Sequence, residues 1–158
     1  MRSTCCAGCG ASTCSTWTPA HHRIDRAGIL PRPRQPIPIW FGGGSEVAFK
    51  RAVRTGDGFT FASAGRKTIE QVDRLRTMLS DAGRDPASFP IEFTLMFGLG
   101  EARWASAIAA AREAGIDYVS INAMSTTAAW TGMEAPGFRG PAQHIAALER
   151  FLEVANNA

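Results

Sequence analysis

Residues 36–61 read PIPIWFGGGSEVAFKRAVRTGDGFTF, and this stretch decides the fold class of the 158-residue chain. The apolar run Ile37–Phe41 predicts a short buried strand, and three glycines and a serine follow it directly. A helical pattern over Glu46–Thr55 comes next, with Ser45 as the expected N-cap. This order is typical of an anion-binding corner, because glycines let a ligand approach the backbone and the helix N-terminus presents unpaired N–H groups.

The same strand–helix alternation continues along the chain. Gly56-Asp57-Gly58 predicts a turn before a second strand, and the later strands and helices are expected over Phe59–Ala62, Thr68–Ala82, Ile91–Leu99, Glu101–Ala114, Ile116–Asn122 and Pro141–Ala155. Met124–Gly140 reads as a long polar loop. Four successive strand–helix units predict an α/β fold with parallel strands and right-handed crossovers. They form either a small open sheet or half of an eight-unit barrel.

Apolar spacing predicts which side of each helix is buried. The helix over Thr68–Ala82 has apolar residues three and four positions apart, which makes one apolar face. In the helix over Glu46–Thr55 the expected buried side chains are Val47, Phe49 and Val53. In the closing helix the residues expected to face inward are Ile145, Leu148, Phe151 and Leu152.

The first 20 residues have no strand or helix periodicity and contain all four cysteines. Reverse translation of residues 3–12 with GC-rich codons, shifted by one base, gives Val-Asp-Leu-Leu-Arg-Arg-Leu-Trp-Arg-Glu, an amphipathic helix. We therefore interpret residues 1–20 as an irregular, out-of-frame segment and residues 21–158 as the folded domain. The C-x2-C spacing of Cys6 and Cys9, with His21 and His22 beyond, leaves a zinc site as an alternative. Prolines across Pro31–Pro38 favour an extended linker.

Composition favours a cytoplasmic protein that binds neither membranes nor nucleic acids. The net charge is +3, and the basic residues are dispersed without interleaved aromatics. No run approaches the roughly 20 apolar residues that a membrane helix needs, and no apolar signal segment is present near Met1.

Residues 36–61 resemble the C-terminal half of the luciferase-like monooxygenase family. The likeness is clearest at Pro-Ile-Pro-Ile-Trp-Phe-Gly-Gly (36–43), Lys50-Arg51-Ala52 and Gly56-Asp57-Gly58, and it extends over about residues 21–156. The resemblance implies a (β/α)8 TIM barrel of which about the last four units are present. It also implies coenzyme F420 or FMN as cofactor, and the Pro-rich entry and Gly-Gly strand end look most like the F420-dependent branch.

The candidate cofactor-binding residues follow from position at the C-terminal ends of strands, where barrel active sites lie. In the family the first of these strand ends contacts the cofactor. The candidates are Gly42, Gly43, Gly44 and Ser45, with Thr60 and Ser63 at the next strand end. A tight turn with no ligand is the other interpretation of the glycines. No catalytic proton donor and no metal ligand are assigned.

The family resemblance implies an oxidoreductase in which the cofactor performs the redox chemistry. In the F420 branch a hydride moves between the deazaflavin C5 and a small organic substrate, and in the FMN branch oxygen is the oxidant. Two other classes stay open: an inactive truncated fragment that self-associates through unpaired strand edges, including as a homodimer, and a zinc-binding module with a βα domain.

Overall fold

The computed structural model describes residues 15–18, 23–28, 30–31, 33–124 and 136–158. Strands β1 (Ser15–Trp17) and β2 (Ile24–Ala27) form an antiparallel hairpin. The larger sheet contains β3 (Trp40–Gly42), β4 (Gly58–Phe61), β5 (Ile91–Met96) and β6 (Tyr118–Asn122). The helices are α2 (Glu46–Thr55), α3 (Arg66–Asp81), α4 (Glu101–Glu113) and α6 (Pro141–Asn157), with 3-10 turns η1 (Pro86–Ser88) and η2 (Phe97–Leu99).

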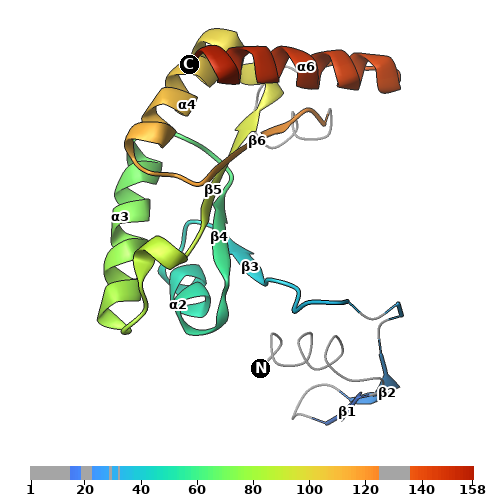
Figure 1. The fold of residues 1–158 in the computed structure, drawn as a ribbon, viewed down its shortest axis with the longest axis vertical. Coiled ribbons are helices and arrows are strands. Elements are labelled where there is room, and N and C mark those ends of the chain that lie inside the picture. Colours follow the sequence, from blue (N-terminus) through green and yellow to red (C-terminus); the bar gives the residue numbers. More distant parts are fainter. Residues whose placement is uncertain (1–14, 19–22, 29, 32, 125–135) are drawn as a thin grey trace.

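The larger sheet is parallel throughout and follows chain order, β3-β4-β5-β6. Figure 1 shows α2, α3 and α4 on the same side of this sheet, with α6 across one end. A doubly wound sheet would reverse its strand order and carry helices on both faces. The predicted α/β fold with parallel strands is therefore confirmed, and its one-directional winding is the winding of a barrel.

The main core lies between the sheet and the helices. Phe49 of α2, Leu75 of α3 and Phe93 of β5 are each at most 1% exposed and belong to one apolar cluster. Burial alternates along β5, so that every second residue faces these helices. The sheet therefore has one apolar face toward the helices and a second, more polar face.

Several strand boundaries differ from the prediction. β3 begins at Trp40 instead of Ile37, which is 61% exposed. Flanking prolines at positions 36 and 38 lack the N–H that a strand ladder needs, which explains the late start. β5 ends at Met96, where its pairing with β6 ends, and the chain turns through η2. The hairpin strand β1 lies inside the segment predicted to be irregular.

Helix α2 matches its predicted bounds at both ends, and Ser45 caps it. The burial predictions are less accurate. Val47 is 59% exposed, since the buried side of α2 is formed by Phe49 and Ala52. In α6 Phe151 is buried, but the other three residues predicted to face inward are exposed: Ile145 by 56%, Leu148 by 47% and Leu152 by 57%.

Two aspartates join neighbouring strands at their N-terminal ends. Asp57 accepts a hydrogen bond from the Ile39 N–H at 2.8 Å, and its own N–H donates to the Ile39 carbonyl at 2.8 Å. Asp117 makes the same reciprocal pair with Ile91, at 2.8 Å and 3.1 Å. Each aspartate thus fixes the register of one strand pair just before the ladder begins.

We expect Asp117→Ala to lower the free energy of unfolding by about 1–3 kcal/mol, because the N–H of the buried Ile91 loses its acceptor. Asp117→Asn, which keeps an acceptor oxygen, should cost less than half as much. Urea denaturation of both variants checks this, and equal losses would contradict the hydrogen-bond explanation.

Candidate functional site

The corner between β3 and α2 is built from Gly42, Gly43, Gly44 and Ser45. Gly43 has φ +121°, a conformation that favours glycine. The Ser45 hydroxyl oxygen accepts a hydrogen bond from the Ala48 N–H at 3.3 Å and so caps α2. The predicted order of strand end, glycine turn and capped helix is therefore present.

Exposed N–H groups are available at this corner. In the part of the chain that the structure describes, the N–H group of Gly44 donates no backbone hydrogen bond, and Gly43 and Gly44 are both exposed. The Gly44 carbonyl is held by the Gln71 side chain of α3 at 3.2 Å. The Ser45 hydroxyl still has its own proton to donate. A fixed turn with open donors at a helix N-terminus suits a phosphate or another anion.

The charge on the first turn of α2 does not oppose an anion. Glu46 forms ion pairs with Lys50 at 2.9 Å and with Arg74 at 2.6 Å. The hydrogen bond from Lys50, together with the Lys50 and Arg74 charges, holds the pKa of the Glu46 carboxyl below its usual value. The Glu46 carboxylate is thus paired with two cations.

The structure brings Thr60 to the corner but not Ser63. Gly42 and Thr60 are register partners on adjacent strands, and a Cβ at Gly42 would lie 3.1 Å from the Thr60 methyl. Ser63 instead forms a hydroxyl–hydroxyl hydrogen bond with Thr68 in the first turn of α3, at 3.1 Å. Ser63 thus helps to fix the start of α3, and its role toward a cofactor stays a prediction.

A row of hydroxyl groups crosses the polar face of the sheet. Thr60, Thr94 and Ser120 lie on β4, β5 and β6, and the Thr94 oxygen is 3.5 Å from the Thr60 oxygen and 3.2 Å from the Ser120 oxygen. The sequence analysis missed this row, although polar residues alternate with apolar ones along β5. Such a row can donate to or accept from the polar edge of a ligand that lies over this face.

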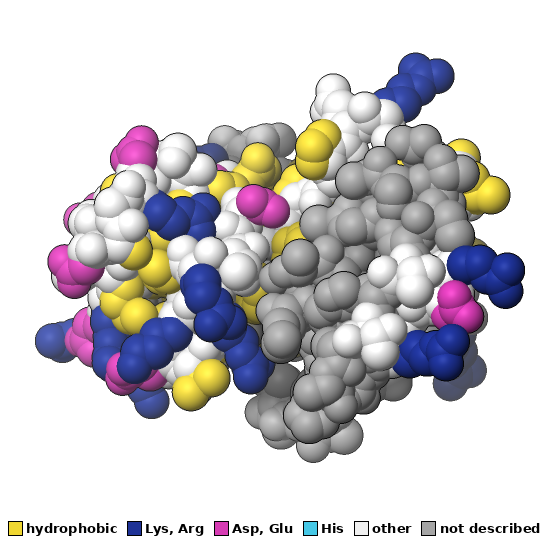
Figure 2. All heavy atoms as spheres, turned by 90° about the horizontal axis from the view of Figure 1, so that it is seen from below, with side chains coloured by type: hydrophobic (Ala, Val, Ile, Leu, Met, Phe, Trp, Pro, Cys, Tyr) yellow, Lys and Arg dark blue, Asp and Glu magenta, His cyan; other side chains and the backbone are white. Residues whose placement is uncertain are grey.

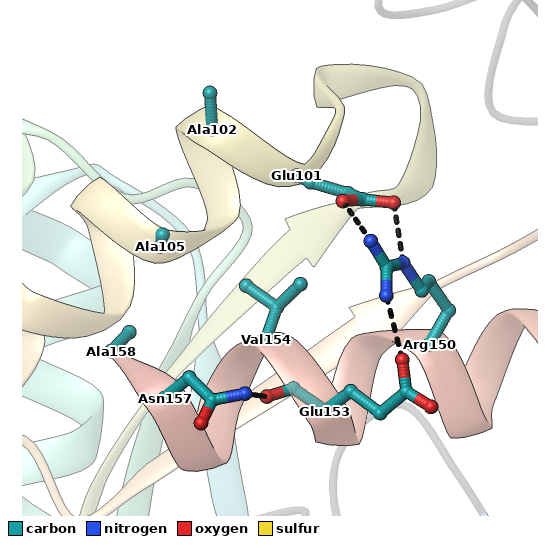
Figure 3. Close-up of a pocket in the computed structure, with 8 residues that line it drawn as sticks. All are labelled: Glu101, Ala102, Ala105, Arg150, Glu153, Val154, Asn157 and Ala158. Atoms are coloured by element: carbon teal, nitrogen blue, oxygen red, sulfur yellow. Dashed lines mark hydrogen bonds and ion pairs between the residues drawn. The ribbon is translucent and has the colours of Figure 1, made fainter.

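Three cavities that are lined by described residues lie away from the corner. One of about 590 Å³ lies between α3 and α4, with Ile69, Leu99 and Arg103 among its lining residues. One of about 430 Å³ lies by Trp40 and Tyr118. The third, of about 460 Å³, lies between α4 and α6 (Figure 3).

The charged groups of the third cavity bind one another. Arg150 of α6 donates two hydrogen bonds of 2.7 Å to the Glu101 carboxylate of α4 and a third of 2.7 Å to Glu153, as Figure 3 shows. The hydrogen bond from Arg150 is the main cause of a lowered pKa at Glu101, and the pKa of Arg150 is raised in return. The hydrogen bonds of Arg150 thus connect α6 to α4 and leave little uncompensated charge in this cavity for a ligand.

Replacing Arg150 with Gln should raise the pKa of Glu101 toward its ordinary value, because the donor that stabilises the carboxylate is lost. A lowered pKa in the folded state stabilises the fold above the ordinary carboxyl pKa, and that contribution disappears as the pH falls through the folded-state pKa. Carboxyl NMR titration of Glu101 checks the shift. Arg112→Gln is the matched control, since Arg112 joins α4 to α6 through the Ala155 carbonyl at 2.8 Å and should leave the Glu101 pKa unchanged.

The described side chains on the face seen in Figure 2 have mixed charge. Figure 2 shows basic side chains next to acidic ones, with hydrophobic side chains between them. Among the described residues no group of three or more His, Cys, Asp or Glu could hold a metal ion. The four cysteines, His21 and His22, on which the zinc interpretation rests, lie outside the described residues. No described helix is both long and apolar enough to cross a membrane.

Comparison with known proteins connects this fold to one family. A family model described as luciferase-like monooxygenase matches residues 9–151. No curated protein matches the chain.

Each match to a solved structure covers most of this chain but less than half of the chain in the solved structure. An F420-dependent secondary alcohol dehydrogenase in complex with an F420–acetone adduct is 15% identical, with 91% of this chain and 48% of that chain covered and a TM-score of 0.45. DmoA from Hyphomicrobium sulfonivorans is 15% identical, with 89% and 34% covered and a TM-score of 0.43. EDTA monooxygenase (EmoA) from Chelativorans sp. BNC1 is 16% identical, with 92% and 36% covered and a TM-score of 0.40.

Proposed function

The chain belongs to the luciferase-like monooxygenase family, and we propose that it forms the cofactor-phosphate side of an oxidoreductase that uses F420, with FMN as the alternative cofactor. The observation that carries this proposal is the corner of Gly42–Ser45, with its open N–H groups at the capped start of α2. A small organic molecule is the proposed substrate.

The donor set of the corner suits the phosphate that both cofactors carry. Gly44 and the first turn of α2 supply N–H groups, and Ser45 supplies a hydroxyl proton. The two cations that pair with Glu46 outnumber its single charge. Gly42 keeps the space beside Thr60 that a Cβ would fill. These features support anion binding by the backbone instead of by a single flexible side chain.

The bound cofactor would supply the redox chemistry, and this chain would supply binding and orientation. The corner would hold the phosphate end. Thr60, Thr94 and Ser120 would offer hydroxyl groups to the polar edge of a ligand over the same face of the sheet. Preordered donors of this kind lose little entropy on binding.

Titration of the folded chain with F420 and with FMN, followed by cofactor fluorescence, tests the proposal. We expect saturable binding of F420 that is weakened by added inorganic phosphate, which competes for the corner. Saturable binding of FMN alone would select the alternative cofactor. A chain that is folded by circular dichroism and binds neither cofactor would overturn the proposal.

A further inference from the structure

The four-stranded sheet has two open edges. β3 pairs with β4 and β6 pairs with β5, and neither edge strand has a second partner among the described residues. All three observed pairings are parallel. Open strand edges are sites at which another strand adds.

At the β6 end of the sheet, α6 has an apolar stripe that no described residue covers. Ile145, Leu148 and Leu152 are between 47% and 57% exposed and lie three and four positions apart, on one side of the helix. A neighbouring side of α6 contains Ala147 and Phe151, each 6% exposed, and Phe151 packs on Trp104 of α4. The helix therefore has two apolar sides, and one of them has a partner.

A negative charge lies within this stripe. Glu149 is four positions after Ile145 and three before Leu152, so it shares their side of the helix. It is exposed and has no ion pair within the described part of the chain.

The outward side of α2, at the β3 end of the sheet, has the complementary character. Val47 is 59% exposed, and Arg51 and Arg54 follow it at spacings of four and seven on the same side. Both arginines are exposed, and neither has an ion pair among the described residues. One end of the sheet thus offers an apolar stripe and a carboxylate, and the other offers an apolar residue and two guanidinium groups, none of which has an ion-pair partner among the described residues.

We propose that two copies of this chain associate, with β6 and α6 of one copy against β3 and α2 of the other. If a twofold axis parallel to the strands relates the two copies, this contact forms twice and every strand pair stays parallel. Two sheets of four strands then close into one of eight, the number at which side chains just fill a barrel interior. Closure satisfies both open edges at once, whereas an unclosed head-to-tail contact would grow into a filament. This inference is independent of which cofactor binds.

Sedimentation equilibrium of the purified chain, with a reductant present because of its four cysteines, tests the proposal. We expect a concentration-dependent mass that rises from 16.9 kDa to a plateau of two chains. A mass of one chain at every concentration overturns the proposal, and so does growth beyond two chains. If another part of the same chain covers the stripe on α6, the mass stays at one chain at every concentration.

Variants of exposed residues locate the contact without disturbing the core. Leu148→Glu combined with Leu152→Glu should weaken the dimer at least about 100-fold, and Glu149→Arg about 10-fold. Adding Arg51→Glu to Glu149→Arg should restore at least half of the lost dimer affinity, measured on a logarithmic scale. The reason is that the two charges are then exchanged across the contact. Glu113→Arg, at an exposed residue of α4, is the matched control and should leave the dimer unchanged. A dimer that none of the α6 or α2 variants weakens uses another surface, and this result overturns the proposal.

Discussion

Replacing Trp104 with Ala should lower the free energy of unfolding by about 3–5 kcal/mol, the usual cost of truncating a large buried aromatic residue. Trp104 is 2% exposed and its ring centroid lies 5.1 Å from that of Phe97 and 5.8 Å from that of Phe151. The residue therefore joins α4 to the end of β5 and to α6. Domains of this size have a total stability of about 5–15 kcal/mol, so the loss should detach α6 or unfold the chain at moderate temperature.

Trp104→Phe separates the packing of this residue from its hydrogen bond. The indole Nε1 donates to the Met96 carbonyl at 3.2 Å, and phenylalanine removes this bond while it keeps an aromatic ring. We expect a loss of about 1–2 kcal/mol for Phe, well below that for Ala. Thermal and urea unfolding, followed by far-UV circular dichroism, measure both. Equal losses would show that the hydrogen bond, and not the packing of the ring, dominates.

The fold could be predicted where local sequence rules agree with one another. Ser45 caps α2 because a serine follows a strand end and precedes a run of helix formers. Gly83 ends α3 with φ +72°, and the Arg84 N–H bonds back to the Leu79 carbonyl at 2.9 Å, as expected for a glycine just past the end of a helix. The alternation of strands and helices along the chain then predicts that the strands of the sheet are parallel.

Burial in α6 could not be predicted in the same way. Periodicity identifies apolar sides of a helix but does not say which neighbouring element covers each side. Ala147 and Phe151 form one apolar side, and Ile145, Leu148 and Leu152 form another. The prediction combined residues from both sides. Only tertiary contacts, here between α6 and α4, distinguish them.

The candidate site was predictable at its backbone but not in its side-chain pairing. The glycine turn and its cap follow from adjacent residues. The hydroxyl row of Thr60, Thr94 and Ser120 instead depends on strand register over separations of 34 and 26 residues, which no local pattern encodes. Ser63 is close to Thr60 in sequence but lies beyond the end of β4, and it bonds to Thr68 of α3, five residues further along the chain.

Placing a carboxylate at the corner should abolish most of its affinity for a cofactor phosphate. In Gly44→Asp the new negative charge lies beside the proposed phosphate position. Two like charges about 4 Å apart repel by about 1–4 kcal/mol between the dielectric constants of water and of a protein surface. Since about 1.4 kcal/mol equals a factor of ten, we expect the Kd for F420 or FMN to rise by a factor of between about 5 and several hundred. Fluorescence titration measures the change.

Two controls separate charge from shape in this experiment. Gly44 has no left-handed φ, and its added Cβ would lie 3.2 Å from the flexible end of the Gln71 side chain, so Gly44→Ala should fold normally and bind with a Kd within about threefold of the original. Gly140→Asp introduces the same carboxylate at the start of α6, where nothing lies within 4 Å of the added Cβ. It should leave binding unchanged. If Gly44→Ala weakened binding as much as Gly44→Asp, steric exclusion would explain the loss, and the electrostatic role of the corner would be wrong.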